Sequence, residues 1–302
     1  MKKTELIGIE PIQDLMELAL WTAYVKYERI VSLMIVAEPE SGKTELLKKY
    51  RDNNGVHGMR RFSAFGVQND LINGRINVLF DKPKILGHIV VYDFATLFSF
   101  KMNTIDSTIA FLDALTEEGL EPESTYAISF DAIKEYKGLK GGIIAAINTQ
   151  GFFTPKGKKR IKASLMKGGF FSRNIMVSYA ISQSHLNEIF DGIKEGKYRS
   201  DKRYVSLVGL DFPNKRIDVK LPRRLSGELL KIVYDIKEEL EDDLGHTVKG
   251  IRLYKSLISL AKASALRDGR LIVNSEDVER IQYLSQWMNL RMNRLKSYYP
   301  YD

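Results

Sequence analysis

Apolar residues follow two different patterns along the chain, and the pattern changes near residue 185. In the first part, apolar runs bounded by turn residues predict strands. Runs as continuous as 30–36 and 141–149 are typical of a parallel sheet covered on both faces. The predicted strands are residues 30–36, 59–67, 75–80, 88–94, 141–149 and 175–179. Apolar residues at helical spacing predict helices at 8–29 and 104–118. This alternation predicts an α/β core over residues 1–184.

The last third of the chain shows helical spacing only. The predicted helices there are residues 225–240, 251–267 and 275–290. Asn274, followed by Asp277, gives a start signal for the last of them. A charged, poorly patterned connection over residues 185–220 precedes these helices. We therefore predict a small all-helical domain over residues 221–302.

The apolar run 30–36 leads through a short loop into the start of a helix at 45–50. Strand, tight loop, Gly-Lys-Thr and helix is the arrangement of a phosphate-binding P-loop. There, loop N–H groups point at the phosphates, Lys43 neutralises the β- and γ-phosphates, and Thr44 offers a hydroxyl to Mg²⁺. Ala37 replaces the first Gly of the usual motif, which requires a negative φ at that position. We expect ATP and Mg²⁺ to be held by Glu38, Pro39, Glu40, Ser41, Gly42, Lys43 and Thr44.

Two further predicted strands end in polar residues. Asp93 resembles the strand-end Asp of a Walker B segment, which holds Mg²⁺. In that frame Phe94 replaces the usual water-activating Glu. Shifted by one residue, Tyr92 replaces the metal-binding Asp and Asp93 takes the place of the Glu. A helix-capping role for Asp93 is the third alternative. Asn148 is placed to orient water against a γ-phosphate, or to open a turn.

Arg173 precedes the predicted strand 175–179 on a short turn that begins with two glycines. From such a position an arginine can reach a nucleotide bound by a neighbouring subunit. An ordinary surface arginine is the alternative.

The charge balance bears on the partner. The chain has 302 residues and a formal net charge of +8, with 46 Lys and Arg against 38 Asp and Glu. An excess of this size is compatible with a nucleic-acid partner. Nine basic residues are concentrated within a short part of the core: Lys134, Lys137, Lys140, Lys156, Lys158, Lys159, Arg160, Lys162 and Lys167. The first three surround Gly138 in a candidate hairpin. Such runs suit DNA or RNA backbones, and they also suit a solvated loop.

Composition excludes several classes of site. The chain has no cysteine, which excludes disulfides and cysteine metal centres, and its four His show no metal-ligand spacing. No apolar run reaches the ~20 residues of a membrane helix. The start lacks the apolar stretch of a signal peptide. We expect a cytoplasmic protein with no membrane segment.

Taken in order, these elements resemble an AAA+ ATPase of the branch that includes MCM replicative helicases, magnesium chelatases and MoxR-type ATPases. The resemblance places Asn148 at sensor 1 and Phe171-Ser172-Arg173 at the arginine finger. Residues 252–263 resemble the lid helix, which places Arg252 at sensor 2, and residues 273–278 resemble the entry to the following helix. Ala37 and the missing Asp-Glu pair depart from the family pattern and indicate a divergent member.

The resemblance implies an ATPase that works as a homo-oligomeric ring or filament, with catalytic roles for Asp93, Asn148, Arg173 and Arg252. An arginine supplied by a neighbour is worth ~10³–10⁵ in rate in other NTPases. The basic residues favour a motor acting on DNA or RNA. The alternatives are a protein remodeller of the MoxR or chelatase kind, and an ATP-binding regulator with little hydrolysis.

Overall fold

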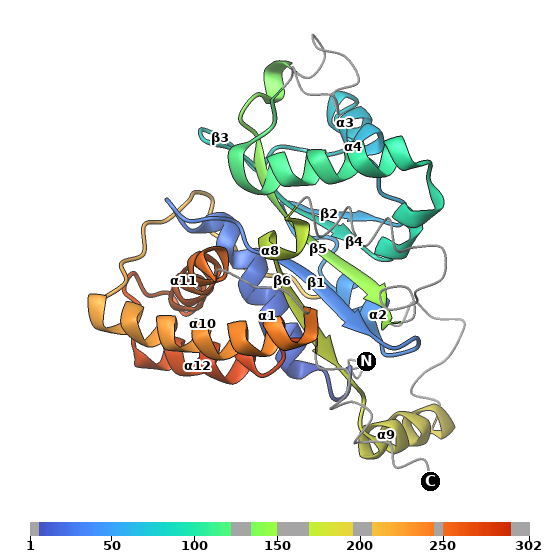
Figure 1. The fold of residues 1–302 in the computed structure, drawn as a ribbon, viewed down its shortest axis with the longest axis vertical. Helices are drawn as coiled ribbons and strands as arrows, with labels where there is room; N and C mark the ends of the chain where they lie inside the picture. Colours follow the sequence, from blue (N-terminus) through green and yellow to red (C-terminus); the bar gives the residue numbers. More distant parts are fainter. Residues whose placement is uncertain (1–5, 122–133, 150–168, 196–206, 245–249, 291–302) are drawn as a thin grey trace.

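The strands form one mostly parallel sheet between helices (Figure 1). The computed structural model describes residues 6–121, 134–149, 169–195, 207–244 and 250–290. Within them, parallel strands lie in the order β2-β4-β5-β1-β6, and β3 joins β4 in the antiparallel sense. The strands are β1 (Ser32–Ala37), β2 (Val56–Met59), β3 (Phe80–Asp81), β4 (Lys84–Val91), β5 (Lys140–Asn148) and β6 (Asn174–Tyr179). The predicted α/β class is confirmed.

Strand β1 lies inside the sheet, between β5 and β6. All residues of β1 and β6 are buried, which explains their continuous apolar sequences. Ala37 pairs with Asn148 on one side and with Tyr179 on the other. The ends of these three strands therefore meet at one edge, here called the carboxyl edge. The opposite edge, where Ser32 pairs with Asn174, is the amino edge.

Two predicted short strands are wrong in most of their length. Residues 59–67 contain the end of β2 and the start of a helix, α3 (Ala64–Ile72). Ser63 caps this helix by accepting a hydrogen bond from Gly66 N, and the buried residues Val67 and Leu71 continue at helical spacing. Of residues 75–80, only Phe80 is in a strand, the two-residue β3.

The α/β part contains helices and helical turns. They are α1 (Glu10–Trp21), η1 (Thr22–Tyr24), α2 (Lys43–Lys48), α3, η2 (Phe94–Ser99), α4 (Met102–Asp113), η3 (Ala114–Glu118), η4 (Lys134–Tyr136), α8 (Phe170–Arg173) and α9 (Gln183–Lys194). Of these, α9 lies apart from the sheet (Figure 1). The predicted hairpin around Gly138 is wrong, because a helical turn precedes this residue and β5, which follows, pairs with parallel neighbours. The predicted irregular connection over residues 185–220 is wrong in its first part, which is helix α9. Ser182 caps it by accepting from His185 N.

The last third is helical, as predicted, in the residues that the structure describes. It contains α10 (Arg223–Leu244), α11 (Ile251–Arg267) and α12 (Ser275–Ser285). The helix-start signal at Asn274 is confirmed, because Asn274 and Asp277 form a reciprocal capping box. Figure 1 shows these helices grouped on one side of the sheet, next to α1.

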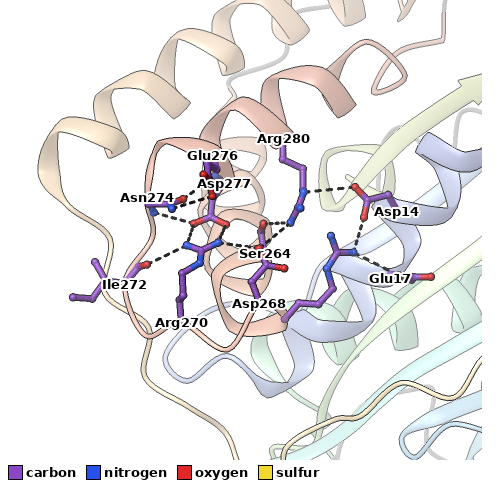
Figure 2. Close-up of polar contacts among 11 residues, drawn as sticks. Asp14, Glu17, Ser264, Asp268, Arg270, Ile272, Asn274, Glu276, Asp277 and Arg280 are labelled. Carbon is purple, nitrogen blue, oxygen red and sulfur yellow. Dashed lines mark hydrogen bonds and ion pairs between the residues drawn. The ribbon is translucent and has the colours of Figure 1, made fainter.

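Charged side chains connect these helices to each other and to α1. Arg270 contacts both carboxylate oxygens of Asp277, at 2.7 and 2.8 Å, as Figure 2 shows. Arg267 contacts Asp14 of α1 at 2.5 Å, and Arg280 reaches the same carboxylate at 4.0 Å. In the described part of the chain, every helix is too short or too polar to cross a bilayer.

Candidate functional site

The loop between β1 and α2 is a tight turn with two residues in the left-handed region. Strand β1 ends at Ala37, and α2 begins at Lys43. Gly42 has φ +79° and Glu40 has φ +63°, both in the left-handed region. Glycine enters this region without steric cost, which gives Gly42 a conformational role. The predicted order of strand, loop and helix is confirmed at this place.

Lys43 folds back into its own loop. Its Nζ donates to Ala37 O at 2.9 Å, to Ser41 Oγ at 3.0 Å and to Glu38 O. Only 7% of the residue is exposed. Burial lowers the pKa of Lys43 to about 8, while the charges of Asp93 and Glu38 oppose the shift. The loop therefore holds an ammonium group among oxygen atoms at the carboxyl edge.

Tyr179 supports this loop from the neighbouring strand. Its hydroxyl donates to Ser41 O at 2.9 Å, and the residue is 3% exposed. Leu6 and Ile9 lie on another side, since a Cβ added to Gly42 would be 3.9 and 3.8 Å from them. The sequence does not indicate these three residues, because their contacts with the loop depend on chain segments that are distant in sequence.

The other predicted residues of the carboxyl edge are Asp93, Asn148 and Thr44. Asp93 is exposed, and it lies close enough to Lys43 for its charge to act on the Lys43 ammonium, in the direction that raises the pKa of Lys43. Its Oδ1 also accepts from Ala95 N at 3.0 Å, so the capping alternative is present in the structure. Asn148 is half-buried and ends β5, the strand between β4 and β1. Thr44 is exposed in the first turn of α2.

The exposed residues of the carboxyl edge determine how Mg²⁺ could be held there. Glu38, Pro39 and Glu40 are exposed, whereas Ser41 is buried. The described residues hold no group of three or more His, Asp or Glu side chains arranged for a metal. Mg²⁺ in nucleotide sites commonly takes only one or two protein ligands and completes its shell with phosphate oxygens and water. A hydroxyl and a carboxylate, both exposed at this edge, fit that mode.

Arg173 and Arg252 lie together, but at the amino edge. Arg173 is the last residue of α8 and contacts Asp113 Oδ1 and Glu117 Oε2, each at 3.2 Å. Arg252 donates to the two oxygens of Glu117 at 2.5 and 2.9 Å, and to Ser172 Oγ at 2.7 Å. The structure therefore brings these two predicted residues to one carboxylate, and it separates them from Lys43 in the same chain.

A third arginine joins this group from the loop before β1. Arg29 donates to Arg252 O at 3.3 Å and to Arg173 O at 3.2 Å. Burial raises the pKa of Asp113 to about 6, with Arg173 opposing the shift. Burial acts in the same direction on Glu117, but the arginines Arg252, Arg173 and Arg29 hold its pKa below the ordinary value.

A cavity of about 1240 Å³ opens beside this group, between the core and the C-terminal helices. Its wall includes the charged residues Arg29, Arg216, Arg252 and Glu117 and the apolar residues Ile236 and Met288. Arg29, Asp113 and Glu117 were not among the residues predicted from the sequence. An acid pair spaced by four residues at the end of a helix was the available signal, and it does not identify its partners.

The basic residues are only partly described. Lys134, Lys137 and Lys140 are exposed, and Lys140 begins β5 and lines the cavity. Lys137 pairs with Glu121 at 3.4 Å. These residues precede or begin β5 and so lie toward the amino edge. The predicted nucleic-acid contacts Lys156, Lys158, Lys159, Arg160, Lys162 and Lys167 lie outside the described residues.

Comparisons with known protein families and with curated proteins found no match: no family model matches the chain, and no curated protein shows significant sequence similarity to it. The resemblance to AAA+ ATPases therefore depends on the residues named above.

Proposed function

We propose that this protein binds Mg²⁺-ATP at the loop 38–44 and hydrolyses it as a homo-oligomer. One observation carries the proposal: the ammonium of Lys43 is held inside a strand–loop–helix turn, next to the strand ends that bear Asp93 and Asn148. Catalysis by P-loop NTPases depends mostly on positioning and charge stabilisation. These residues supply both.

Phosphate binding exchanges the partners of Lys43. In the free chain its ammonium is satisfied by loop oxygens. Phosphate oxygens of ATP compete for the same three N–H groups, and the N-terminus of α2 adds further donors. Thr44 and Asp93 would hold Mg²⁺, which when bound neutralises charge on the β- and γ-phosphates. Asn148, between them, orients the attacking water.

Arg173 and Arg252 act on the nucleotide of a neighbouring protomer. They lie at the amino edge, whereas Lys43 follows the far end of β1, and a six-residue strand spans roughly 20 Å. Their guanidinium groups therefore cannot serve the ATP of their own chain without a large rearrangement. A head-to-tail contact between protomers places one amino edge against the next carboxyl edge, which produces a ring or a filament.

We further propose that ATP turnover drives movement along DNA or RNA. The exposed Lys134, Lys137 and Lys140 support this choice, together with the basic residues that follow in the sequence. Action on a protein substrate, as in MoxR-type or chelatase remodellers, is the second candidate. Regulation by ATP binding with little hydrolysis is the third.

Two measurements test these proposals in sequence. Lys43→Ala should abolish Mg²⁺-ATP binding in calorimetry while its thermal unfolding stays cooperative, and unchanged binding contradicts the proposal. ATPase rates at two protein concentrations, with and without single- and double-stranded DNA or RNA, then separate the candidates. Nucleic-acid stimulation supports the motor. An ATPase rate that does not change when nucleic acid is added supports the protein remodeller. ATP binding without measurable hydrolysis supports the regulator.

A further inference from the structure

Glu117 is the shared partner of two arginines from different elements. Its carboxylate contacts Arg252 through both oxygens, and Oε2 also lies 3.2 Å from Arg173. A planar guanidinium recognises a carboxylate and a phosphate through the same pair of parallel N–H contacts. The carboxylate of Glu117 therefore occupies a position that a phosphate can occupy equally well.

Arg29 fixes the relative position of these two arginines. It donates to the main-chain oxygens of Arg252 and Arg173, and so connects α11 to α8. It takes no part in the Glu117 contacts that the structure shows, although the charge of Glu117 acts on it. Its buried Nε has no hydrogen-bond acceptor among the described residues. A buried guanidinium N–H without an acceptor is costly, so Arg29 holds the two arginines in place at some expense.

The charge balance of the group favours an anion. Three guanidinium groups (Arg29, Arg173 and Arg252) face two carboxylates (Asp113 and Glu117). Displacing Glu117 would leave the arginines with a single acid. The adjoining cavity of about 1240 Å³ provides room for a polyphosphate.

We propose that Arg29, Arg173 and Arg252 form a preorganised phosphate-binding unit, which Glu117 occupies in the free chain in place of phosphate, and in which Arg29 is the positioning residue. The proposal rests on the proposed function in one respect: it identifies the arriving phosphate as that of a neighbour's nucleotide. In consequence, the arginines do not become available until an oligomer contact or a phosphate displaces Glu117.

Inorganic triphosphate tests the unit without relying on ATP turnover. The experiment uses the full chain with Lys43→Ala, which removes the phosphate site at the carboxyl edge. Adding Glu117→Gln should tighten triphosphate binding in calorimetry about tenfold, because a neutral amide competes less well for the arginines. Asp106→Asn is the matched control. It removes the same charge from an exposed residue of α4 that does not line the cavity, and it should change affinity by less than about twofold.

Arg29 is tested in the same background. Adding Arg29→Met to Glu117→Gln should return triphosphate binding to the starting affinity, and Arg29→Lys should retain part of the gain. If Glu117→Gln fails to fold, Asp113→Asn releases Arg173 instead and should tighten binding severalfold. Equal affinity for the Glu117→Gln and Asp106→Asn chains overturns the proposal.

Turnover of the chain with intact Lys43 separates this proposal from the proposed function. Arg29→Met should lower kcat at least tenfold and leave KM for ATP within about twofold, with partial rescue by Arg29→Lys. A fall in ATP affinity instead contradicts a positioning role for Arg29. Tight triphosphate binding in a chain that lacks ATPase activity refutes the proposed function and retains the anion site.

Discussion

The hydroxyl of Tyr179 donates a 2.9 Å hydrogen bond to the main-chain oxygen of Ser41, and so connects the end of β6 to the loop that contains Lys43. The phenol is almost fully buried, and burial raises its pKa, so it stays neutral as a donor over the physiological range. The bond fixes one peptide of the loop, and Ser41 in turn presents its Oγ to the Lys43 ammonium.

Tyr179→Phe should therefore weaken ATP binding about three- to tenfold while lowering the free energy of unfolding by about 1 kcal/mol, the usual net value of a hydrogen bond. Tyr50→Phe is the matched control. That buried tyrosine also loses a hydrogen bond, the one to Glu17, but it lies beyond the end of α2. It should lower stability and leave ATP affinity unchanged. Equal ATP affinity in the two variants would refute a role for Tyr179 in the loop.

Lys43 should make ATP affinity depend on pH. Its pKa in the free chain is lowered to about 8, mainly by burial, so the ammonium is half lost at pH 8 and almost fully lost by pH 10. Because phosphate binding needs the charged form, calorimetry should show affinity falling between pH 8 and pH 10. Lys43→Arg keeps its charge and should lack this dependence. A flat profile in the unsubstituted chain contradicts the prediction.

The same shift acts on stability with the opposite sign. The pKa of Lys43 is lower in the folded chain than in the unfolded chain, so the unfolded chain binds more protons between pH 8 and about 10.5. In that window, without nucleotide, the free energy of unfolding of the unsubstituted chain should rise relative to Lys43→Met. Urea unfolding of both chains at pH 8 and pH 10 measures the difference.

The loop at 38–44 could be predicted because all its signals are local. An apolar run, Gly42-Lys43-Thr44 and the following helix start are contiguous in the chain, and the structure confirms their order. Helix α9 is missed although its signals are also local. Leu186, Ile189, Phe190 and Ile193 stand at helical spacing after the capping Ser182, within a stretch that the prediction treats as a charged connection.

The amino-edge group could be predicted only in part. Arg173 and Arg252 were found from their positions in separate motifs, but nothing local indicates that they share Glu117. Arg29 lies on a third segment, and its contacts cross 144 and 223 residues of sequence. Contacts of this kind depend on how β6 and α11 pack, which a single sequence does not specify.

Asp93→Asn should distinguish a role of Asp93 in ATP hydrolysis from its role as a helix cap. Asn is as good a helix cap as Asp, so the contact with Ala95 N should persist and thermal stability should change little. Loss of the carboxylate should lower ATPase turnover at least tenfold. A fall in Mg²⁺-dependent ATP binding would assign a metal-ligand role, and a fall in kcat alone would assign a role toward water. Full activity would leave only the cap.

Arg270→Met should destabilise the C-terminal helices. Asp277 is 1% exposed and receives two contacts from Arg270, so removing the arginine leaves a buried carboxylate with Asn274 N and the Ser264 side chain as its remaining hydrogen-bond partners. Breaking a buried pair in this way costs about 3 kcal/mol. Lys194→Met, which breaks an exposed pair with Asp191, should cost less than about 0.5 kcal/mol. Chemical denaturation measures both. A loss below about 1 kcal/mol for Arg270→Met would show that Asn274 N and Ser264 stabilise the Asp277 carboxylate without the arginine.

Mixing two inactive variants tests whether catalysis is shared between protomers. Lys43→Ala should be unable to bind ATP, and Arg173→Ala should bind ATP without turning it over. In a mixture, some contacts pair an intact Lys43 loop with an intact Arg173 from the other variant, so part of the activity should return. The restored rate should be highest near equal proportions and should fall on dilution as the oligomer dissociates. Mixing Lys43→Ala with a Lys43→Ala/Arg173→Ala chain is the control, because neither partner offers an intact loop. Absence of activity at every ratio, in samples shown to be oligomeric, would place the action of Arg173 within its own chain or outside catalysis.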